Sequence, residues 1–106
     1  MIAKTPKPPY FAVMFSSVLN ETHEGYQEMA DEMIKQAEAQ PGFLGIESAR
    51  NDLGISVSYW SDEASIKNWK EQLRHQLAQK YGREKWYNSF MTRVAKVERD
   101  YGFGEF

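Results

Sequence analysis

Apolar and polar positions alternate along four stretches of the chain and recur with a helical period along two others. The alternating stretches are typical of half-buried β-strands: residues 10–19, 43–50, 54–60 and 88–99. Residues 26–37 repeat apolar side chains at the spacing of an amphipathic helix, and a second helical pattern begins near Asp62 and continues through Gln79. The pattern therefore predicts the element order β-α-β-β-α-β.

This order is that of the ferredoxin-like, split βαβ plan of the α+β class. It places both helices on one face of a four-stranded antiparallel sheet. The first strand is apolar on both faces, with Phe11 and Val13 on one side and Ala12 and Met14 on the other. An uncovered apolar sheet face needs a partner, and the simplest partner is a second copy related by a two-fold axis. We therefore expect a homodimer.

Local residues mark where these elements start and stop. Thr22 is a candidate cap for the first helix, and Ser61 or Asp62 offers a side-chain oxygen to the start of the second. Pro41-Gly42 ends the first helix. Residues 51–54 form a turn, so the second and third strands are expected to pair as a hairpin.

A chain of 106 residues suits one domain, which we assign to residues 10–106. Residues 1–9 hold three of the four prolines and are expected to form an extended arm. Residues 83–87 read as a connecting turn. The last seven residues carry three aromatic side chains, which predicts that this tail docks on the protein.

Composition excludes several classes of function. The formal net charge is −2 and basic residues are scattered, which argues against nucleic acid or an anionic membrane as partners. The chain has no cysteine, and its two histidines are far apart, so neither thiol chemistry nor a metal site is expected. No stretch resembles a signal peptide or a membrane span, which makes the cytoplasm the default location.

Aromatic residues are abundant, at 14%. Tyr59, Trp60 and Trp69 are candidate walls of a small-molecule pocket, although the two tryptophans also suit packing. His75 follows Trp69 by six residues and has a pKa suited to a general base. On a continuous helix it lies roughly opposite Ile66, facing solvent, so a role for it requires a bend.

Three segments of the chain together resemble the antibiotic biosynthesis monooxygenase superfamily of dimeric α+β barrels. They are QPGFLGIES, ISVSYWSDEASIKNWKEQLRH and MTRVAKVE. The likeness covers residues 10–99. Characterised relatives include cofactor-independent oxygenases of anthrones and quinols, and also haem-degrading monooxygenases. The resemblance implies that Trp69 lines the pocket and that His75 occupies a position where many members carry histidine or another polar aromatic residue.

The chain departs from the catalytic sets of both branches. The haem-degrading branch implies an axial histidine where this chain has Gln79, and an asparagine on the first strand where it has Ser16 or Ser17. Haem is therefore disfavoured. The anthrone branch implies an asparagine one turn before the tryptophan, where this chain has Ser65, with Asn68 beside Trp69.

These observations lead to one main hypothesis and two alternatives. The main hypothesis is a cofactor-independent monooxygenase that acts on a small aromatic quinol or anthrone, with Trp69 and His75 as the catalytic candidates. The alternatives are a non-catalytic module that sequesters a hydrophobic metabolite and, less favoured, a haem-binding or haem-degrading protein. The candidate substrate-binding residues are Trp60, Tyr59, Ser16, Ser65, Asn68, Tyr81, Trp86 and Arg93.

Three of these residues have alternative interpretations. Tyr81 and Trp86 belong to an aromatic and cationic cluster that forms either a lid over the pocket or, as the favoured alternative, a packed connector. Arg93, on the last strand, either faces the pocket or pairs with an acid.

Overall fold

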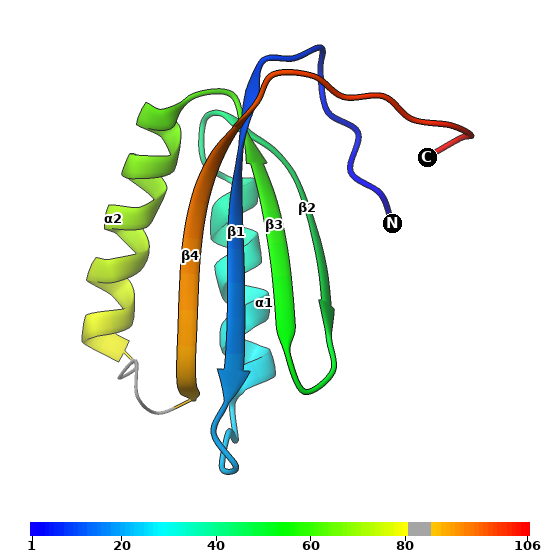
Figure 1. Ribbon diagram of the computed structural model, residues 1–106. Coiled ribbons are helices and arrows are strands. Elements are labelled where there is room, and N and C mark those ends of the chain that lie inside the picture. Colours follow the sequence, from blue (N-terminus) through cyan, green and yellow to red (C-terminus); the bar gives the residue numbers. More distant parts are fainter. Residues whose placement is uncertain (81–85) are drawn as a thin grey trace.

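The computed structural model describes the backbone of residues 1–80 and 86–106 and the side chains of residues 1–73 and 86–106. The predicted element order is confirmed (Figure 1). The elements are β1 (Tyr10–Leu19), α1 (Tyr26–Glu38), β2 (Phe43–Arg50), β3 (Gly54–Trp60), α2 (Glu63–Lys80) and β4 (Tyr87–Val97).

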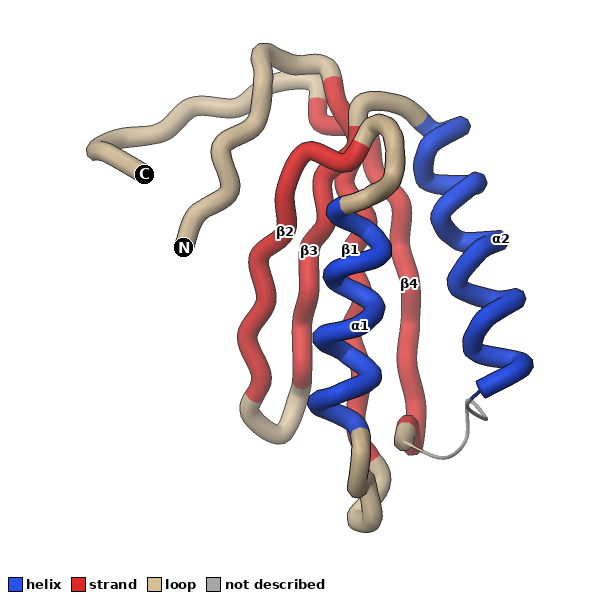
Figure 2. Tube along the Cα trace, turned by 180° about the vertical axis from the view of Figure 1, so that it is seen from behind, coloured by secondary structure: helices blue, strands red, loops and turns tan. Residues whose placement is uncertain are grey.

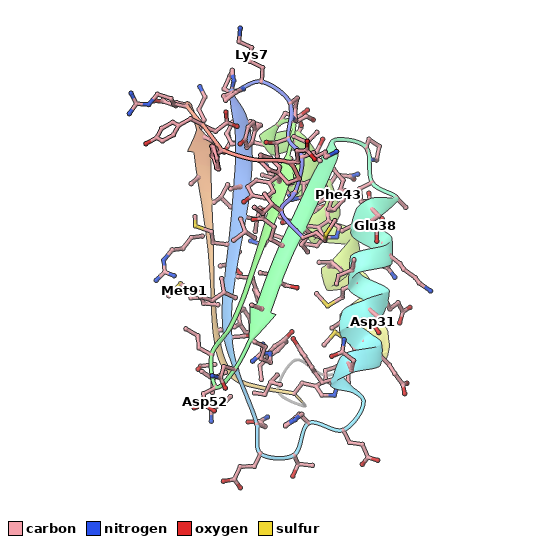
Figure 3. All side chains as sticks on the ribbon, turned by 90° about the vertical axis from the view of Figure 1, so that its right-hand side faces the viewer. Lys7, Asp31, Glu38, Phe43, Asp52 and Met91 are labelled. Carbon is pink, nitrogen blue, oxygen red and sulfur yellow. The ribbon has the colours of Figure 1, made fainter. Side chains whose placement is uncertain are left out.

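The four strands form one antiparallel sheet in the order β2-β3-β1-β4. Figures 1 and 2 show opposite sides of this sheet, and both helices lie on the same side of it. The edge-on view in Figure 3 separates the sheet from the helix layer. The fold is therefore the ferredoxin-like α+β arrangement that the sequence predicts.

Strand alternation divides the side chains between a helix-facing side and an open face. Val13 packs with Ala37 of α1 and Ile66 of α2, so the odd-numbered residues of β1 point toward the helices. Val13 lies opposite Val94 of β4 in the sheet register, which places Val94 on the same side. Figure 3 shows Met91 on the open face, away from both helices.

The two helices begin in different ways. Asp62 caps α2 as predicted, because its Oδ1 accepts a bond of 2.7 Å from the backbone N–H of Ser65. That bond lowers the pKa of the Asp62 carboxyl. The prediction that Thr22 caps α1 is wrong. The N-cap is Gly25, with φ +86° and no side-chain cap, and its carbonyl accepts from the N–H of Met29 at 3.2 Å. Glycine adopts this left-handed backbone without steric cost.

The last strand begins and ends earlier than predicted. Residues 83–85 of the expected connecting turn lie outside the described residues, and Tyr87 already belongs to β4. Tyr87 pairs with Leu19 across a register shift in β1, which extends the ladder by one pair. The strand ends at Val97 rather than Arg99 because its partner β1 begins at Tyr10, opposite Val97.

The N-terminal arm folds back on the chain's own sheet. The backbone N–H of Ala3 donates to Oε2 of Glu47 on β2 at 2.9 Å. Thr5 donates from Oγ1 to the hydroxyl of Tyr10 at 3.1 Å. The arm also passes directly over Gly45, where a Cβ atom would lie only 2.9 Å from that of Ala3. Glycine at this position therefore permits the close approach.

The C-terminal tail is fastened at its start and extended beyond it. Asp100 accepts a hydrogen bond of 2.6 Å from the hydroxyl of Tyr10. Tyr101 and Phe103 are 92% and 100% exposed, whereas Phe106 is 42% exposed and lies near Gly102. The tail is therefore held at Asp100, while the rings of Tyr101 and Phe103 do not dock on the described part of this subunit.

Candidate functional site

Trp60 forms the buried floor beneath α2. It is 0% exposed at the end of β3, and its ring lies 4.9 Å from that of Trp69 at an interplanar angle of 30°. Phe43 meets it edge to face at 5.4 Å. Its Nε1 donates to Oγ of the buried Ser58 at 2.9 Å. Trp60 is therefore fully packed and its indole N–H has a hydrogen-bond partner. Its ring forms the surface against which Trp69 packs.

Trp69 differs from Trp60 in one respect. Its Nε1 is buried and has no hydrogen-bond partner among the described residues. A buried donor left unpaired costs about 1–3 kcal/mol, and such groups in native structures call for an explanation. An oxygen atom of a bound ligand would supply the missing acceptor.

The helix-facing side of β4 is incompletely covered. Val94 and Phe90 are 51% and 40% exposed. The residues that pair with them in β1, Val13 and Ser17, are buried on the same side of the sheet. Figure 2 shows this side, with α2 beside the edge strand β4. Trp69 packs against the core that includes Val13. We call this region, bordered by Trp69, Val94 and Phe90, the helix-side site.

Four aromatic rings gather at the end of the helix-side site where β4 begins. Tyr87 lies 5.5 Å from Phe15, 5.7 Å from Tyr26 and 5.6 Å from Phe90, and Phe15 lies 5.4 Å from Phe90, all between ring centroids. We call these four residues the aromatic cluster. Burial raises the pKa of Tyr87, and its interaction with the Tyr26 hydroxyl raises it further. Tyr87 is therefore a hydrogen-bond donor at neutral pH.

Arg50 lies against this cluster from β2. Its Nη1 donates to the carbonyl of Ser17 at 3.2 Å, and its Nη2 donates to Oγ of Ser17 and to the Tyr26 hydroxyl, the latter at 3.3 Å. The guanidinium carbon is 5.3 Å from the centre of the Tyr26 ring. A Cβ atom at Gly54 would collide with the guanidinium, so glycine there lets Arg50 cross β3.

Sequence reasoning missed Arg50 and the aromatic cluster. In the sequence, Tyr26 is one position of an amphipathic-helix pattern, and Arg50 is the polar last residue of a predicted strand. The available signal was Gly54 at the start of β3, because a strand glycine often marks a close approach of another group.

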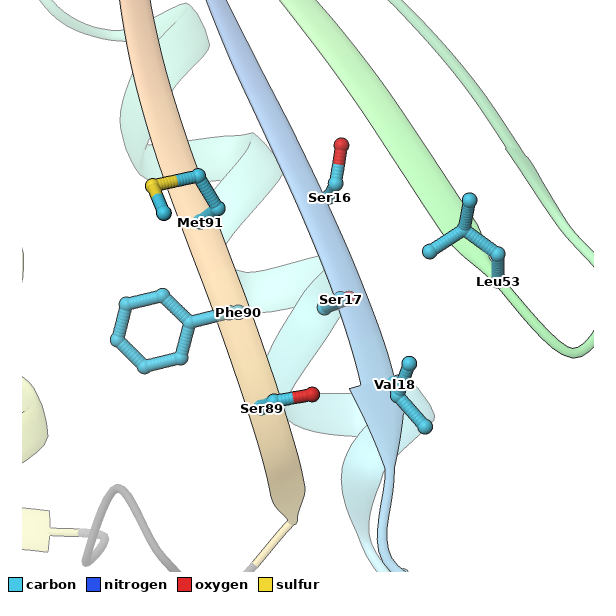
Figure 4. A pocket seen from close by; sticks show the side chains of 7 residues that line it. All are labelled: Ser16, Ser17, Val18, Leu53, Ser89, Phe90 and Met91. Carbon is cyan, nitrogen blue, oxygen red and sulfur yellow. The ribbon is translucent and has the colours of Figure 1, made fainter.

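Three predicted site residues lie on the open face instead. The sheet separates Tyr59, Ser16 and Arg93 from Trp69, because their register places them on the side opposite the helices. Ser16 lines a hollow of about 270 Å³ together with neighbouring side chains (Figure 4). The residues around that hollow are Ser16, Ser17, Val18, Leu53, Ser89, Phe90 and Met91.

Tyr59 belongs to a hydrogen-bonded group on this open face. Its hydroxyl donates to Oε1 of Glu47 at 2.7 Å, and its ring meets that of Tyr10 edge to face at 5.9 Å. Burial, followed by the bond to Glu47, raises the pKa of Tyr59 to about 12. Glu47 therefore holds both Tyr59 and the backbone of the arm at Ala3.

Tyr59 is expected to ionise about two pH units above an ordinary tyrosine. Since its folded pKa exceeds its unfolded value of 10.0, the protonated phenol stabilises the fold fully below pH 10. That contribution is lost as the pH rises through 12. The difference in ultraviolet titration between the wild type and Tyr59→Phe isolates this group. A difference curve centred near 10 would contradict the assignment.

The remaining candidates are distributed around the molecule. Ser65 lies in the first turn of α2, packed against Gly42 at the entrance to β2. Asn68 is exposed and donates to Oε1 of Gln40 at 3.4 Å, linking α2 to the loop after α1. Both lie on the same helix as Trp69, but the contacts just given point toward the β2 side.

Trp86 anchors the connection between β1 and α1. It is buried, and its Nε1 donates to the carbonyl of Glu24 at 2.9 Å. Its own carbonyl accepts from the N–H of Asn20 at 2.8 Å. The side chains of His75 and Tyr81 lie outside the described residues, so their predicted roles stay predictions.

The described residues include neither a cluster of metal-binding side chains nor a helix suited to crossing a membrane. No three histidine, cysteine or acidic side chains in that part of the chain come together as metal ligands would. Neither described helix combines the length and apolarity that crossing a membrane requires.

A known protein family matches most of this chain. The profile of the family described as antibiotic biosynthesis monooxygenase matches residues 9–81. The chain belongs to the antibiotic biosynthesis monooxygenase family. The uncharacterized protein YqjZ of Bacillus subtilis (strain 168) is 49% identical over 106 residues, covering 98% of this chain and 93% of the relative.

Solved structures share the fold at low sequence identity. SnoaB from Streptomyces nogalater, a cofactor-independent oxygenase, aligns with a TM-score of 0.65 at 10% identity and covers 92% of this chain and all of its own. A MhuD variant with two manganese protoporphyrin IX molecules per active site aligns with a TM-score of 0.63 at 14% identity. That alignment covers 88% of this chain and 99% of the MhuD chain. Proteins that share this fold thus include both a cofactor-independent oxygenase and a protein that binds a protoporphyrin, so the chemistry of this chain must be argued from its own residues.

Proposed function

We propose that this family member is a cofactor-independent monooxygenase of a small, electron-rich aromatic substrate such as a quinol or anthrone. The observation that carries the proposal is the buried, unpartnered Nε1 of Trp69 at the border of the helix-side site. Substrates of this class carry a ring oxygen that can accept its hydrogen bond. The exposed helix-facing side chains Val94 and Phe90 offer the apolar surface on which the ring would lie.

The chemistry needs little from the protein beyond orientation and a dry site. An anthrone loses one proton from its methylene carbon, and the resulting anion passes electrons to O2. A carbon–oxygen bond forms, the O–O bond breaks with loss of water, and the products are a quinone and H2O. Negative charge resides on the ring oxygen of the anion, where the Trp69 N–H would stabilise it. His75 is proposed as the base that takes the methylene proton.

The positions that the haem-degrading branch uses support a haem-free reaction. Ser16 lies on the open face, away from Trp69. Ser17 lies on the helix-facing side, but its hydroxyl is bound by Arg50 and the side chain is buried. Neither serine is available to serve as the polar group that this branch carries on the first strand.

We further propose that the protein acts as a homodimer in the cytoplasm. Large apolar side chains stand exposed on or beside the open face, and a second copy packed sheet to sheet would cover them. The most exposed of them are Val18, Leu53, Ile55 and Met91.

Oxygen uptake by the purified protein tests the proposal. The protein is treated with a chelator and offered anthrone and a series of naphthoquinols, without added metal, flavin or haem. We expect oxygen consumption that matches quinone formation and depends on protein concentration. Binding without turnover would favour the sequestering module instead, and a Soret band on titration with haemin would favour the haem alternative.

A further inference from the structure

The helix-facing side of the sheet contains a positive charge that no described acid neutralises. Arg50 makes three hydrogen bonds, to the carbonyl and Oγ of Ser17 and to the Tyr26 hydroxyl, and no ion pair with any residue of the described part. Ser17 is itself buried. Arg50 itself is exposed, so its charge can be reached by a ligand from solvent.

Donor groups remain after these contacts are counted. A guanidinium carries five N–H donors, and three are used. The hydroxyls of Tyr26 and Tyr87 add two O–H donors, on rings that lie 5.7 Å apart between centroids. The bond from Arg50 polarises the Tyr26 hydroxyl, and bonds assisted by a charge are the stronger kind.

Glycine at position 54 of β3 makes room for the Arg50 guanidinium. The guanidinium lies where a side chain at Gly54 would begin, so any other residue would displace it. On the far side of Tyr26, the rings of Phe15, Tyr87 and Phe90 form an apolar wall. A cation, two hydroxyls and an aromatic wall thus lie together at one end of the helix-side site.

We propose that Arg50, Tyr26 and Tyr87 bind an anionic oxygen of an aromatic ligand whose ring lies against Phe15 and Phe90. The shared chemistry is an aryl anion, either a carboxylate or a phenolate on the ring. This inference deepens the proposed function, on which the aromatic identity of the ligand rests, because it adds an acidic group as a requirement of the substrate.

Calorimetric binding of matched probes tests this subsite without any need for turnover. The probes are 1-hydroxy-2-naphthoate, its methyl ester and 1-naphthol, each titrated into the full chain at a pH below and a pH above the naphthol pKa. We expect the carboxylate to bind at least about tenfold more tightly than the ester, as one hydrogen-bonded charge provides. Tighter naphthol binding only at the higher pH would assign the phenolate as the anion.

Two variants and one control test whether the preference for the anion depends on Arg50. Arg50→Gln and Gly54→Ala are both expected to remove the preference for the anion while leaving binding of the ester within about twofold. Arg99→Gln removes the same charge from an exposed position beyond β4 and is expected to keep the preference. Thermal unfolding confirms that each variant is folded at the titration temperature.

The outcomes separate this inference from the proposed function. A preference that survives in Arg50→Gln, or equal binding of all three probes by the wild type, overturns the subsite. Loss of the preference in Arg50→Gln together with no oxygen uptake for any substrate keeps the subsite and removes the oxygenase. A variant that does not fold is replaced by Tyr87→Phe, which removes one of the donor hydroxyls and is expected to weaken binding of the anion alone.

Discussion

Trp60→Ala is expected to lower the free energy of unfolding by about 3–5 kcal/mol, the cost of truncating a large aromatic side chain in a core. Trp60 is fully buried between Phe43 and Trp69, and its removal also leaves the hydroxyl of Ser58 without the indole partner. Since small domains have a total stability of about 5–15 kcal/mol, the loss is a large fraction of the whole. Urea unfolding followed by circular dichroism measures it.

Phe103→Ala provides the matched control for that experiment. It truncates another aromatic residue, but one that is fully exposed in the tail. A surface change of this kind is expected to stay within about 0.5 kcal/mol. If Trp60→Ala cost no more than Phe103→Ala, Trp60 would not be the core platform on which Trp69 rests.

Trp69→Phe is expected to separate function from stability. Phenylalanine retains a ring above Trp60 but removes the buried Nε1 donor. Loss of a donor that bonds the ring oxygen of the substrate anion costs about 1–3 kcal/mol of transition-state stabilisation, or roughly 5- to 150-fold in kcat/KM for oxygen uptake. The free energy of unfolding is expected to change by less than about 1.5 kcal/mol, because the substitution keeps an apolar ring in place.

The opposite result would identify Trp69 as a packing residue. In that case Trp69→Phe would keep its kcat/KM while losing stability in proportion to the apolar surface removed. Kinetics and urea unfolding on the same preparation distinguish the two results.

The elements of this fold could be predicted because each follows a local rule. Alternation defined β1, and the carboxyl of Asp62 marked the start of α2. Thr22 failed as a cap because the chain uses the left-handed backbone of Gly25 instead, which needs no side-chain oxygen. A sequence shows that a glycine is present, but it does not show which of two neighbouring signals the backbone will follow.

The candidate site was harder to predict because it depends on which side of the sheet a residue occupies. Adjacent strand residues point to opposite faces, so Tyr59 and Trp60 cannot both line one pocket. That conflict was already present in the sequence. The approach of Arg50 to Ser17 across Gly54 was not, because it requires the register of three strands.

The central claim is that the indole of Trp69 binds the ligand, and its N–H signal tests this directly. The chain has three tryptophans, and the N–H groups of Trp60 and Trp86 are already bonded to Ser58 and Glu24. Nitrogen–proton correlation spectra, assigned by the peak missing in Trp69→Phe, follow all three during titration with 1,4-naphthoquinone. The Trp69 signal alone is expected to move strongly downfield, and a Trp69 signal that moves no more than the other two would show that its indole does not bind the ligand.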